Sequence, residues 1–180
     1  MDRQPTLVGE LLLLRPLTDV DREELYAVAA DPQLWALHPA HDRWQWPVFD
    51  ALFDEALAHG GALAVIEKAS GRIVGSSQYR ASAKVAGAVE IGWTFLARSH
   101  WGGETNRELK RLMLTHLLAH VNRAVFRVGV DNLRSRRAME KIGGRLMELR
   151  EDVPYPDGRV IAHVFYEIDR AGFAARPLSS

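Results

Sequence analysis

The segment from Glu90 to Glu108 constrains the fold of this chain more than any other, because a strand pattern passes through paired glycines into a helix pattern. Apolar and aromatic residues up to Leu96 favour a strand, and the residues after the glycines repeat at helical spacing. Gly102 and Gly103 let backbone N–H groups approach an anion closely, and a helix N-terminus adds partial positive charge. The same connection is also common as a simple tight turn. The segment therefore predicts a strand, a turn and a helix in that order. Whether the turn also binds an anion is not decided by this pattern alone.

Strand and helix patterns alternate along the rest of the chain, which indicates a mixed α/β (α+β) fold. A capping box formed by Thr18 and Asp21 predicts the start of the first helix. Further helices are expected from Pro47 to Gly60 and over residues 106–121 and 133–142. No repeat or linker interrupts this order, so the sequence predicts one domain spanning residues 1–180. The expected strands lie at residues 8–16, 63–69, 73–80, 85–96, 125–130, around 146, and 160–168.

Composition narrows the classes of function. The formal net charge is zero over 180 residues, so no overall field favours a nucleic-acid or membrane partner. There is no cysteine, which excludes disulfides, thiolate metal sites and a cysteine nucleophile. The longest apolar run, Leu11 to Leu14, is too short to span a bilayer, and residues 1–10 lack a signal-peptide pattern. We therefore expect a cytoplasmic protein with no membrane and no nucleic-acid partner.

A second motif follows the strand expected at residues 125–130: it runs from Asn132 through Ser135, Glu140 and Lys141 and ends in two glycines, Gly143 and Gly144. Here the sequence resembles the GNAT family of acyl-CoA N-acyltransferases, and within it the branch of ribosomal-protein N-terminal (alanine/serine) acetyltransferases. Gly144 stands where the family usually has phenylalanine, and residues 90–93 are similar to its central strand. The opening Leu-Leu-Leu-Arg-Pro-Leu is similar to the first strand of that branch. The matching residues of the second motif are Asn132, Ser135, Glu140, Lys141 and Gly143.

The resemblance implies the GNAT fold, a mixed, mostly antiparallel central sheet with flanking helices in which two central parallel strands splay apart. It also implies an acetyl-CoA-dependent N-acetyltransferase (an acyltransferase) that needs no metal. Unpaired backbone groups in the splay would hydrogen-bond the pantetheine arm, and here Phe95, Leu96 and Ala97 would supply that edge. The pyrophosphate would lie over the helix start, and the remaining contacts to acetyl-CoA would come from Trp101, Gly102, Gly103, Glu104, Thr105, Asn106, Arg107, Asn132 and Ser135.

One residue departs from the family's phosphate loop. Glu104 stands where that loop has its key glycine, and a carboxylate near a pyrophosphate is repulsive. Glutamate also tolerates a positive φ poorly. Arg98 and Arg107 would offset part of the charge. We expect weaker CoA binding than in family members with glycine there, and Glu104→Gly to tighten it.

The resemblance also implies catalytic roles. Glu90 is the expected general base, because family members often use a carboxylate on this strand; the alternative is a glutamate that faces solvent or pairs with arginine. Glu151 and Asp152 are fallback bases on a later strand. Ser135 matches a serine that the branch is proposed to use beside the departing thiolate, and Met139 stands where other members have a tyrosine for that role.

Several of these residues have structural alternatives. Ser135 and Asn132 are both suited to capping the helix that follows. Tyr155 and Tyr166 are alternative proton donors, although strand tyrosines are more often core or rim residues.

Three other groups of residues are candidates for a site because of their residue types. His116 and His120 are four apart on a helix, as zinc ligands can be, but no third ligand is evident and we expect an ordinary helix face. One group either lines the acceptor site or packs the helical arm: Trp35, Trp44, Trp46, His38 and His41. Three residues are expected to be solvated or to contact phosphate rather than to bind nucleic acid: Arg134, Arg136 and Arg137.

By branch resemblance, the expected reaction transfers acetyl from acetyl-CoA to a protein N-terminal amine. Two alternatives stay open, because one fold hosts many acceptors. The first is acetylation of a small amine, such as an antibiotic, a polyamine or an amino acid. The second is a CoA-binding module without catalysis, which Glu104 and the missing helix tyrosine keep open. A homodimer is common in the family.

Overall fold

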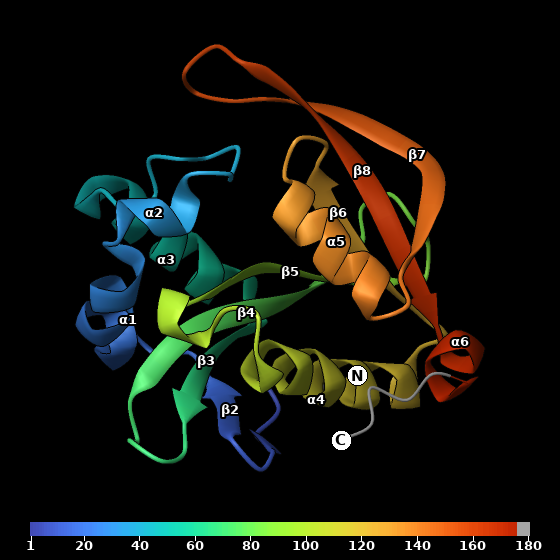
Figure 1. Cartoon of the computed structure of the whole chain (residues 1–180), viewed down its shortest axis with the longest axis horizontal. Helices are drawn as coiled ribbons and strands as arrows, with labels where there is room; N and C mark the ends of the chain where they lie inside the picture. The colour runs from blue at the N-terminus through green and yellow to red at the C-terminus, as the bar shows by residue number, and fades with distance from the viewer. Residues whose placement is uncertain (176–180) are drawn as a thin grey trace.

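The computed structural model describes residues 1–175 as helices packed on one eight-stranded sheet (Figure 1). The strand order is β1-β2-β3-β4-β5-β6-β8-β7, and neighbouring strands are antiparallel except for β5 and β6. The strands are β1 (Leu7–Val8), β2 (Leu12–Pro16), β3 (Ala62–Glu67), β4 (Ile73–Ala81), β5 (Val89–Leu96), β6 (Arg123–Gly129), β7 (Arg145–Pro154) and β8 (Val160–Asp169).

Helices cover both faces of the sheet, and each face has its own core. In one cluster α1, α2 and α3 pack on the sheet, and in the other α4 and α5 do. Along β3, Leu63 and Val65 join the α4 side while Ala62, Ala64 and Ile66 join the α3 side. Burial on both faces explains why this strand is apolar throughout. The helices are α1 (Arg22–Ala29), α2 (Pro32–Trp35), α3 (Trp46–His59), α4 (Glu104–His120), α5 (Leu133–Lys141) and α6 (Arg170–Ala175), with 3₁₀ turns η1 (Asp19–Asp21) and η2 (Arg98–His100).

The parallel strands β5 and β6 pair at only two positions, Val89 with Ala124 and Glu90 with Val125. Beyond Glu90 the two strands diverge, so β5 stays paired to β4 on one side and β6 to β8 on the other. This arrangement is the predicted mixed, mostly antiparallel sheet with two splayed parallel strands at its centre.

Local signals in the sequence match the structure at several element ends. Thr18 and Asp21 form the predicted capping box, and Gly60 ends α3 in the left-handed conformation. The expected strand at residues 8–16 is instead two strands, because the Gly9 N–H donates to the Leu12 carbonyl and turns the chain. The short helices α2 and α6 were not predicted.

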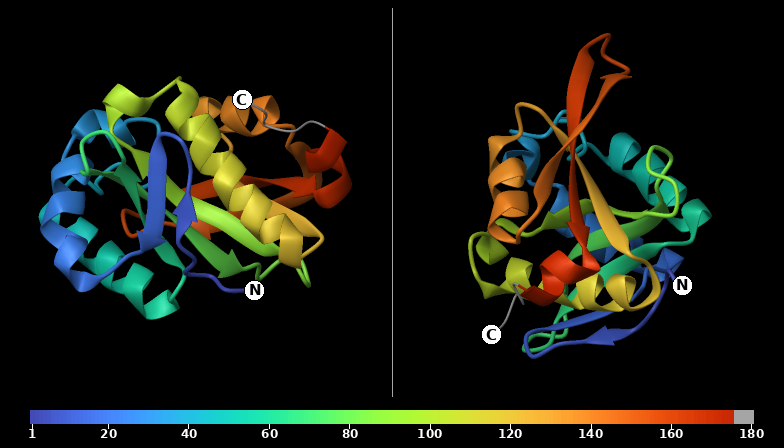
Figure 2. Two further views of the ribbon diagram at one scale, coloured as in Figure 1. Left: turned by 90° about the horizontal axis from the view of Figure 1, so that it is seen from below. Right: turned by 90° about the vertical axis from the view of Figure 1, so that its right-hand side faces the viewer.

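The β7–β8 hairpin projects beyond the rest of the sheet (Figure 2). Arg159, at its turn, donates to the Pro39 carbonyl at 2.6 Å, which ties the hairpin to the segment between α2 and α3. Within residues 1–175, no helix combines the length and apolarity needed to cross a membrane.

Candidate active site

A cavity of about 150 Å³ opens where β5 and β6 diverge. Its floor and walls come from β5, β6, α4 and α5, and its outer end comes from the β7–β8 hairpin and the segment between α2 and α3. The cavity therefore lies in the splay in which the pantetheine arm was expected. Its lining includes His38, Pro39, Arg43, Glu90, Ile91, Gly92, Trp93, Thr94, Lys110, Phe126, Arg127, Val128, Gly129, Asn132, Ser135, Met139, Tyr155 and His163.

A β-bulge in β5 forms one wall of this cavity. Gln78 pairs with Gly92 and Ser76 pairs with Phe95, so Trp93 and Thr94 together oppose a single residue of β4. Trp93 has φ +51°, and no other non-glycine residue in the described part of the chain has a positive φ. A left-handed conformation costs a non-glycine residue about 1–2 kcal/mol, so the packing around Trp93 must hold it there.

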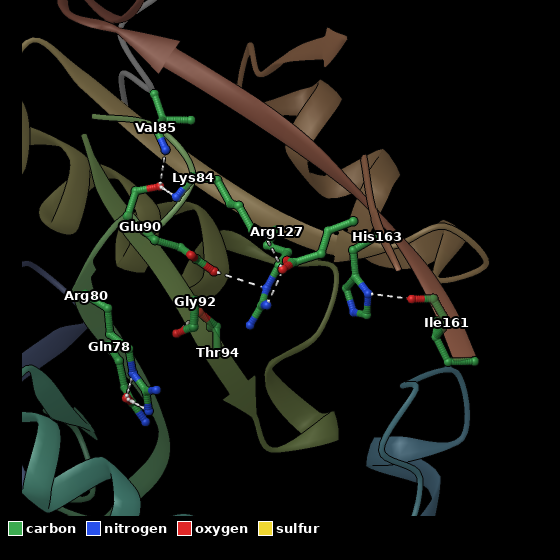
Figure 3. Close-up of polar contacts among 12 residues, drawn as sticks. Gln78, Arg80, Lys84, Val85, Glu90, Gly92, Thr94, Arg127, Ile161 and His163 are labelled. Carbon is green, nitrogen blue, oxygen red and sulfur yellow. Dashed lines mark hydrogen bonds and ion pairs between the residues drawn. The ribbon is translucent and has the colours of Figure 1, made fainter. Parts of the chain in front are cut away.

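The Trp93 ring has two arginines near it, which helps to hold the bulge. The Arg80 guanidinium carbon is 3.7 Å from the ring centroid and that of Arg127 is 5.9 Å away. Arg127 Nε also lies 3.6 Å from Glu90 Oε1 (Figure 3), and the positive charges of Arg127 and Arg80 both lower the pKa of the Glu90 carboxyl group.

Glu90 is buried in the cavity wall, with 9% of its surface exposed. Burial raises the pKa of its carboxyl group above the ordinary value, and the positive charges of Arg127 and Arg80 oppose that rise. Gly92 lies two residues further along the strand and has no side chain to cover the carboxylate. The alternative in which Glu90 faces solvent is thus wrong. Glu90 does pair with an arginine, and its carboxylate is still accessible from the cavity, as a base requires.

The start of α5 lies across the cavity from the bulge. Asn132 caps the helix, because its Oδ1 accepts the Ser135 N–H at 3.2 Å, so the capping alternative is confirmed for Asn132. The capping alternative is wrong for Ser135, because Ser135 is the third residue of the helix, and it lines the cavity. Met139 also lines the cavity, one turn further along the helix.

The alternative proton donors and bases differ in whether they line the cavity and in their pKa. Tyr166 is 1% exposed, donates to Glu140 and lies outside the cavity lining, so it is a core residue. Tyr155 does line the cavity, with its hydroxyl 3.3 Å from His163 Nε2, and burial raises its pKa. Glu151 pairs with Lys84 and Arg127, and these contacts hold the pKa of its carboxyl group low, which makes it a weak base.

The glycine turn has the geometry of an anion site. Gly102 takes φ +70°, and Gly103 precedes the first residue of α4. A side chain at either glycine would point into open space, so a ligand can approach the backbone there. Glu104 begins the helix and has no positive φ, so the backbone strain expected at this position is absent. The positive φ of this turn falls on Gly102 instead. The first turn of α4 presents Glu104, Thr105, Asn106 and Arg107.

Part of the predicted pantetheine edge is already used within the protein. The Trp101 indole donates to the Leu96 carbonyl at 3.0 Å, and the Ala97 N–H donates to Val74 of β4. The Phe95 ring packs on Trp35 at 5.1 Å between centroids. The turn η2 causes this by folding Trp101 back onto the end of β5. The edge that faces the cavity therefore lies earlier in β5, over residues 92–94.

Arg134 lies beside the glycine turn. The sequence predicted only that it is solvated or contacts a phosphate, without placing it at this turn. Its guanidinium carbon lies 3.9 Å from the Trp101 ring centroid, and its Nη2 donates to the Leu34 carbonyl. Its companions differ: Arg136 bonds to Tyr166 and to the Val130 carbonyl, and Arg137 is exposed. A cation stacked beside a glycine turn suits a phosphate.

The tryptophan and histidine group serves mainly as packing. Trp35 is 2% exposed in the core and donates to the Ala29 carbonyl, and Trp44 and Trp46 lie outside the cavity lining. His38 does line the cavity, whereas His41 contacts Arg159 of the hairpin.

His116 and His120 form an ordinary helix face. His116 contacts the Asp2 carbonyl and His120 contacts the His116 carbonyl. Over residues 1–175, no group of three or more histidine, cysteine or acidic residues is arranged to hold a metal ion.

Comparison with known proteins agrees with this fold. Residues 12–145 match the family described as the acetyltransferase (GNAT) domain. The fold is similar to a GCN5-related N-acetyltransferase from Brucella melitensis, at 22% identity, 96% coverage of this chain, 81% of that chain and a TM-score of 0.80. It is similar to RimJ from Mycobacterium smegmatis in complex with CoA-disulfide, at 20% identity, 96% and 95% coverage and a TM-score of 0.70. It is also similar to spermidine N-acetyltransferase from Vibrio cholerae in complex with CoA and spermine, at 14% identity, 92% and 99% coverage and a TM-score of 0.67.

Proposed function

Because this chain belongs to the GNAT acetyltransferase family and is an acetyl-CoA-dependent acetyltransferase, we propose that its acceptor is the α-amine of a protein N-terminus. RimJ and the spermidine enzyme represent two different acceptor classes on the same fold. Charge in the cavity favours the first class over the second.

The observation that carries this proposal is the charge of the cavity lining. Glu90 is its one carboxylate among the described residues, whereas three basic side chains, Arg43, Lys110 and Arg127, line it too, as do His38 and His163. A polyamine carries several positive charges and needs several acidic partners. An N-terminal α-amine reacts in its neutral form, so one buried carboxylate and flanking arginines do not oppose it.

Deprotonation energies point the same way. An α-amine with a pKa near ~7.8 costs only about 1 kcal/mol to deprotonate at pH 7, whereas a lysine side chain near ~10.4 costs about 4.6 kcal/mol. A single base of modest strength is sufficient for the first and marginal for the second. Glu90, with its raised pKa, is that base in our proposal.

The roles of the other residues follow from their positions. The N-terminus of α4 with Gly102 and Gly103, together with Arg134, holds the pyrophosphate. The edge of β5 at the bulge holds the pantetheine arm, and Ser135 lies beside the thioester. These residue roles are predictions. So are the single-domain organisation, the cytoplasmic location and the homodimer.

The test is an acceptor screen that follows release of the CoA thiol. We expect turnover with short peptides that have a free N-terminus, and none with the same peptides blocked by N-terminal acetylation. A lysine inside each blocked peptide supplies a matched side-chain amine. Equal turnover of blocked peptides, or a preference for spermidine over every free peptide, would contradict the proposal.

A further inference from the structure

Lys110 is a buried ammonium group at the cavity that the roles above do not use. It lies on α4, is 4% exposed and lines the cavity between β5 and β6. No carboxylate lies within ion-pair distance of it in the described part of the chain. Buried lysines are rare without such a partner, because desolvating an ammonium ion is costly.

Lys110 makes one side-chain hydrogen bond among the described residues. Its Nζ donates to Thr94 Oγ1 at 3.0 Å, and Thr94 in turn contacts Ser77 Oγ at 2.7 Å. Thr94 is the second residue of the β5 bulge, so the bulge fixes the position of the ammonium group. The Phe126 ring centroid lies 5.5 Å from Nζ. An ammonium group has three donors, and Thr94 accepts one of them.

The reaction needs a proton donor that the usual position does not supply. Met139 lines the cavity where the family's tyrosine would lie, and a methionine cannot donate a proton. A serine hydroxyl such as Ser135 is a very weak acid. The splay that holds the thioester is bounded by the bulge on one side and α5 on the other, and Lys110 lines the same space.

We propose that the Lys110 ammonium group protonates the sulfur of the departing CoA. This role rests on the acetyl transfer described above and does not depend on the identity of the acceptor. As the amine forms its bond to the thioester carbon, the C–S bond breaks and its electron pair moves to sulfur. A proton from Lys110 Nζ joins that sulfur, the amine releases its own proton towards Glu90, and Lys110 regains a proton from solvent through the cavity.

The acidity of Lys110 suits this role. Burial lowers the pKa of its ammonium group to about 8, so the group is protonated at neutral pH yet close to giving up its proton. Other charged or titratable groups also face this cavity, and any pH profile will include them: Glu90 from β5, Arg127 from β6, His163 from β8, Tyr155 from the hairpin turn, and His38 and Arg43 from the segment between α2 and α3.

The first test uses bound CoA and no acceptor, so it is independent of the N-terminal proposal. Ultraviolet absorbance of the thiolate is followed against pH for free CoA and for CoA bound to the protein. A nearby ammonium group should lower the thiol pKa, and we expect a thiolate fraction at least tenfold higher in the complex near pH 7. Lys110→Met should abolish that increase, whereas Lys141→Met, which changes an exposed lysine on α5, should keep it.

The second test is kinetic. General acid catalysis typically contributes 10²- to 10⁴-fold, so Lys110→Met should lower kcat by at least 10²-fold while calorimetry shows little change in acetyl-CoA affinity. Lys110→Gln can still donate to Thr94 but has no acidic proton, and it should be as slow as Lys110→Met if it is folded. Three results would overturn the role: an unshifted thiol in the wild-type complex, full activity of Lys110→Gln, or stoichiometric acetylation of Lys110 itself.

Discussion

At the scale of single residues, Glu90 shows how burial turns an ordinary side chain into a base. Its carboxyl group is desolvated beside Gly92, and Arg127 limits how far its pKa rises. A base acts in its ionised form, so activity must fall as pH drops through the raised pKa. The same burial without any arginine would hold the carboxyl group neutral and inactive over a wider pH range.

We therefore predict that Glu90→Gln lowers kcat by about 10²-fold and removes the acidic limb of its pH profile. In the wild type that limb should lie above the ordinary glutamate pKa, because burial raises the pKa of Glu90. The measurement is kcat against pH with a saturating peptide acceptor. A variant that keeps the wild-type limb would show that another group is the base.

Glu104 is the second residue with a testable effect. It is exposed at the first turn of α4, so its charge acts on bound phosphates through solvent. Glu104→Gln removes that charge and keeps the helix, and acetyl-CoA affinity should rise about two- to threefold at low salt. Titration calorimetry at low and high salt checks this. An affinity gain that persists in high salt would contradict an electrostatic cause.

At the scale of elements, Glu108 joins the start of the chain to α4. Its buried carboxylate accepts the N–H groups of Glu10, Leu11 and Leu12 at 2.7–2.9 Å. Glu10 and Leu11 lie in the turn between β1 and β2 and Leu12 begins β2, and a turn at a sheet edge has few other partners. One side chain on α4 thus fixes where the first hairpin packs.

Glu108→Ala should accordingly destabilise the protein by about 3–4 kcal/mol, because one buried and two part-buried backbone donors lose their acceptor. Urea unfolding measures the change in free energy. Glu23→Ala is the matched control, since Glu23 is exposed on α1 and its loss should change stability by less than about 0.5 kcal/mol. Equal stability of both variants would show that water replaces the carboxylate without cost.

At the scale of the whole molecule, the sheet is incomplete where β5 and β6 diverge, and the glycine turn of α4 lies beside that gap (Figure 1). A ligand that binds both regions joins the two halves of the sheet. Any ligand that binds only the folded state raises its stability by mass action.

Acetyl-CoA at about 100 times its Kd should therefore stabilise the fold by about 2.7 kcal/mol and raise Tm by about 5–10 °C. Gly103→Val is the matched variant, because a side chain there meets no protein atom and points into open space. It should melt within a few degrees of the wild type without ligand and lose most of the rise with ligand. A full rise in Gly103→Val would place the phosphates elsewhere.

Short-range signals in the sequence predicted most of the elements, and the resemblance of two motifs to the GNAT family predicted the identity of the fold. The Thr18 capping box, the Gly60 helix end and the apolar run of β3 act within a few residues of their own positions. Asn132 as a helix cap and Glu90 on the central strand follow from equally local patterns. Such interactions are readable because both partners stand next to each other in the chain.

Only the tertiary structure decided which groups meet at the cavity. Trp93 is left-handed because β4 opposes two residues of β5 with one, and Arg134 reaches Trp101 from a helix 33 positions later in the chain. Lys110 shares a helix face with Leu114 and Leu117, which the sequence could have revealed, but its contact with Thr94 depends on the bulge. These contacts join residues distant in sequence, so their geometry exists only after the sheet and helices have packed.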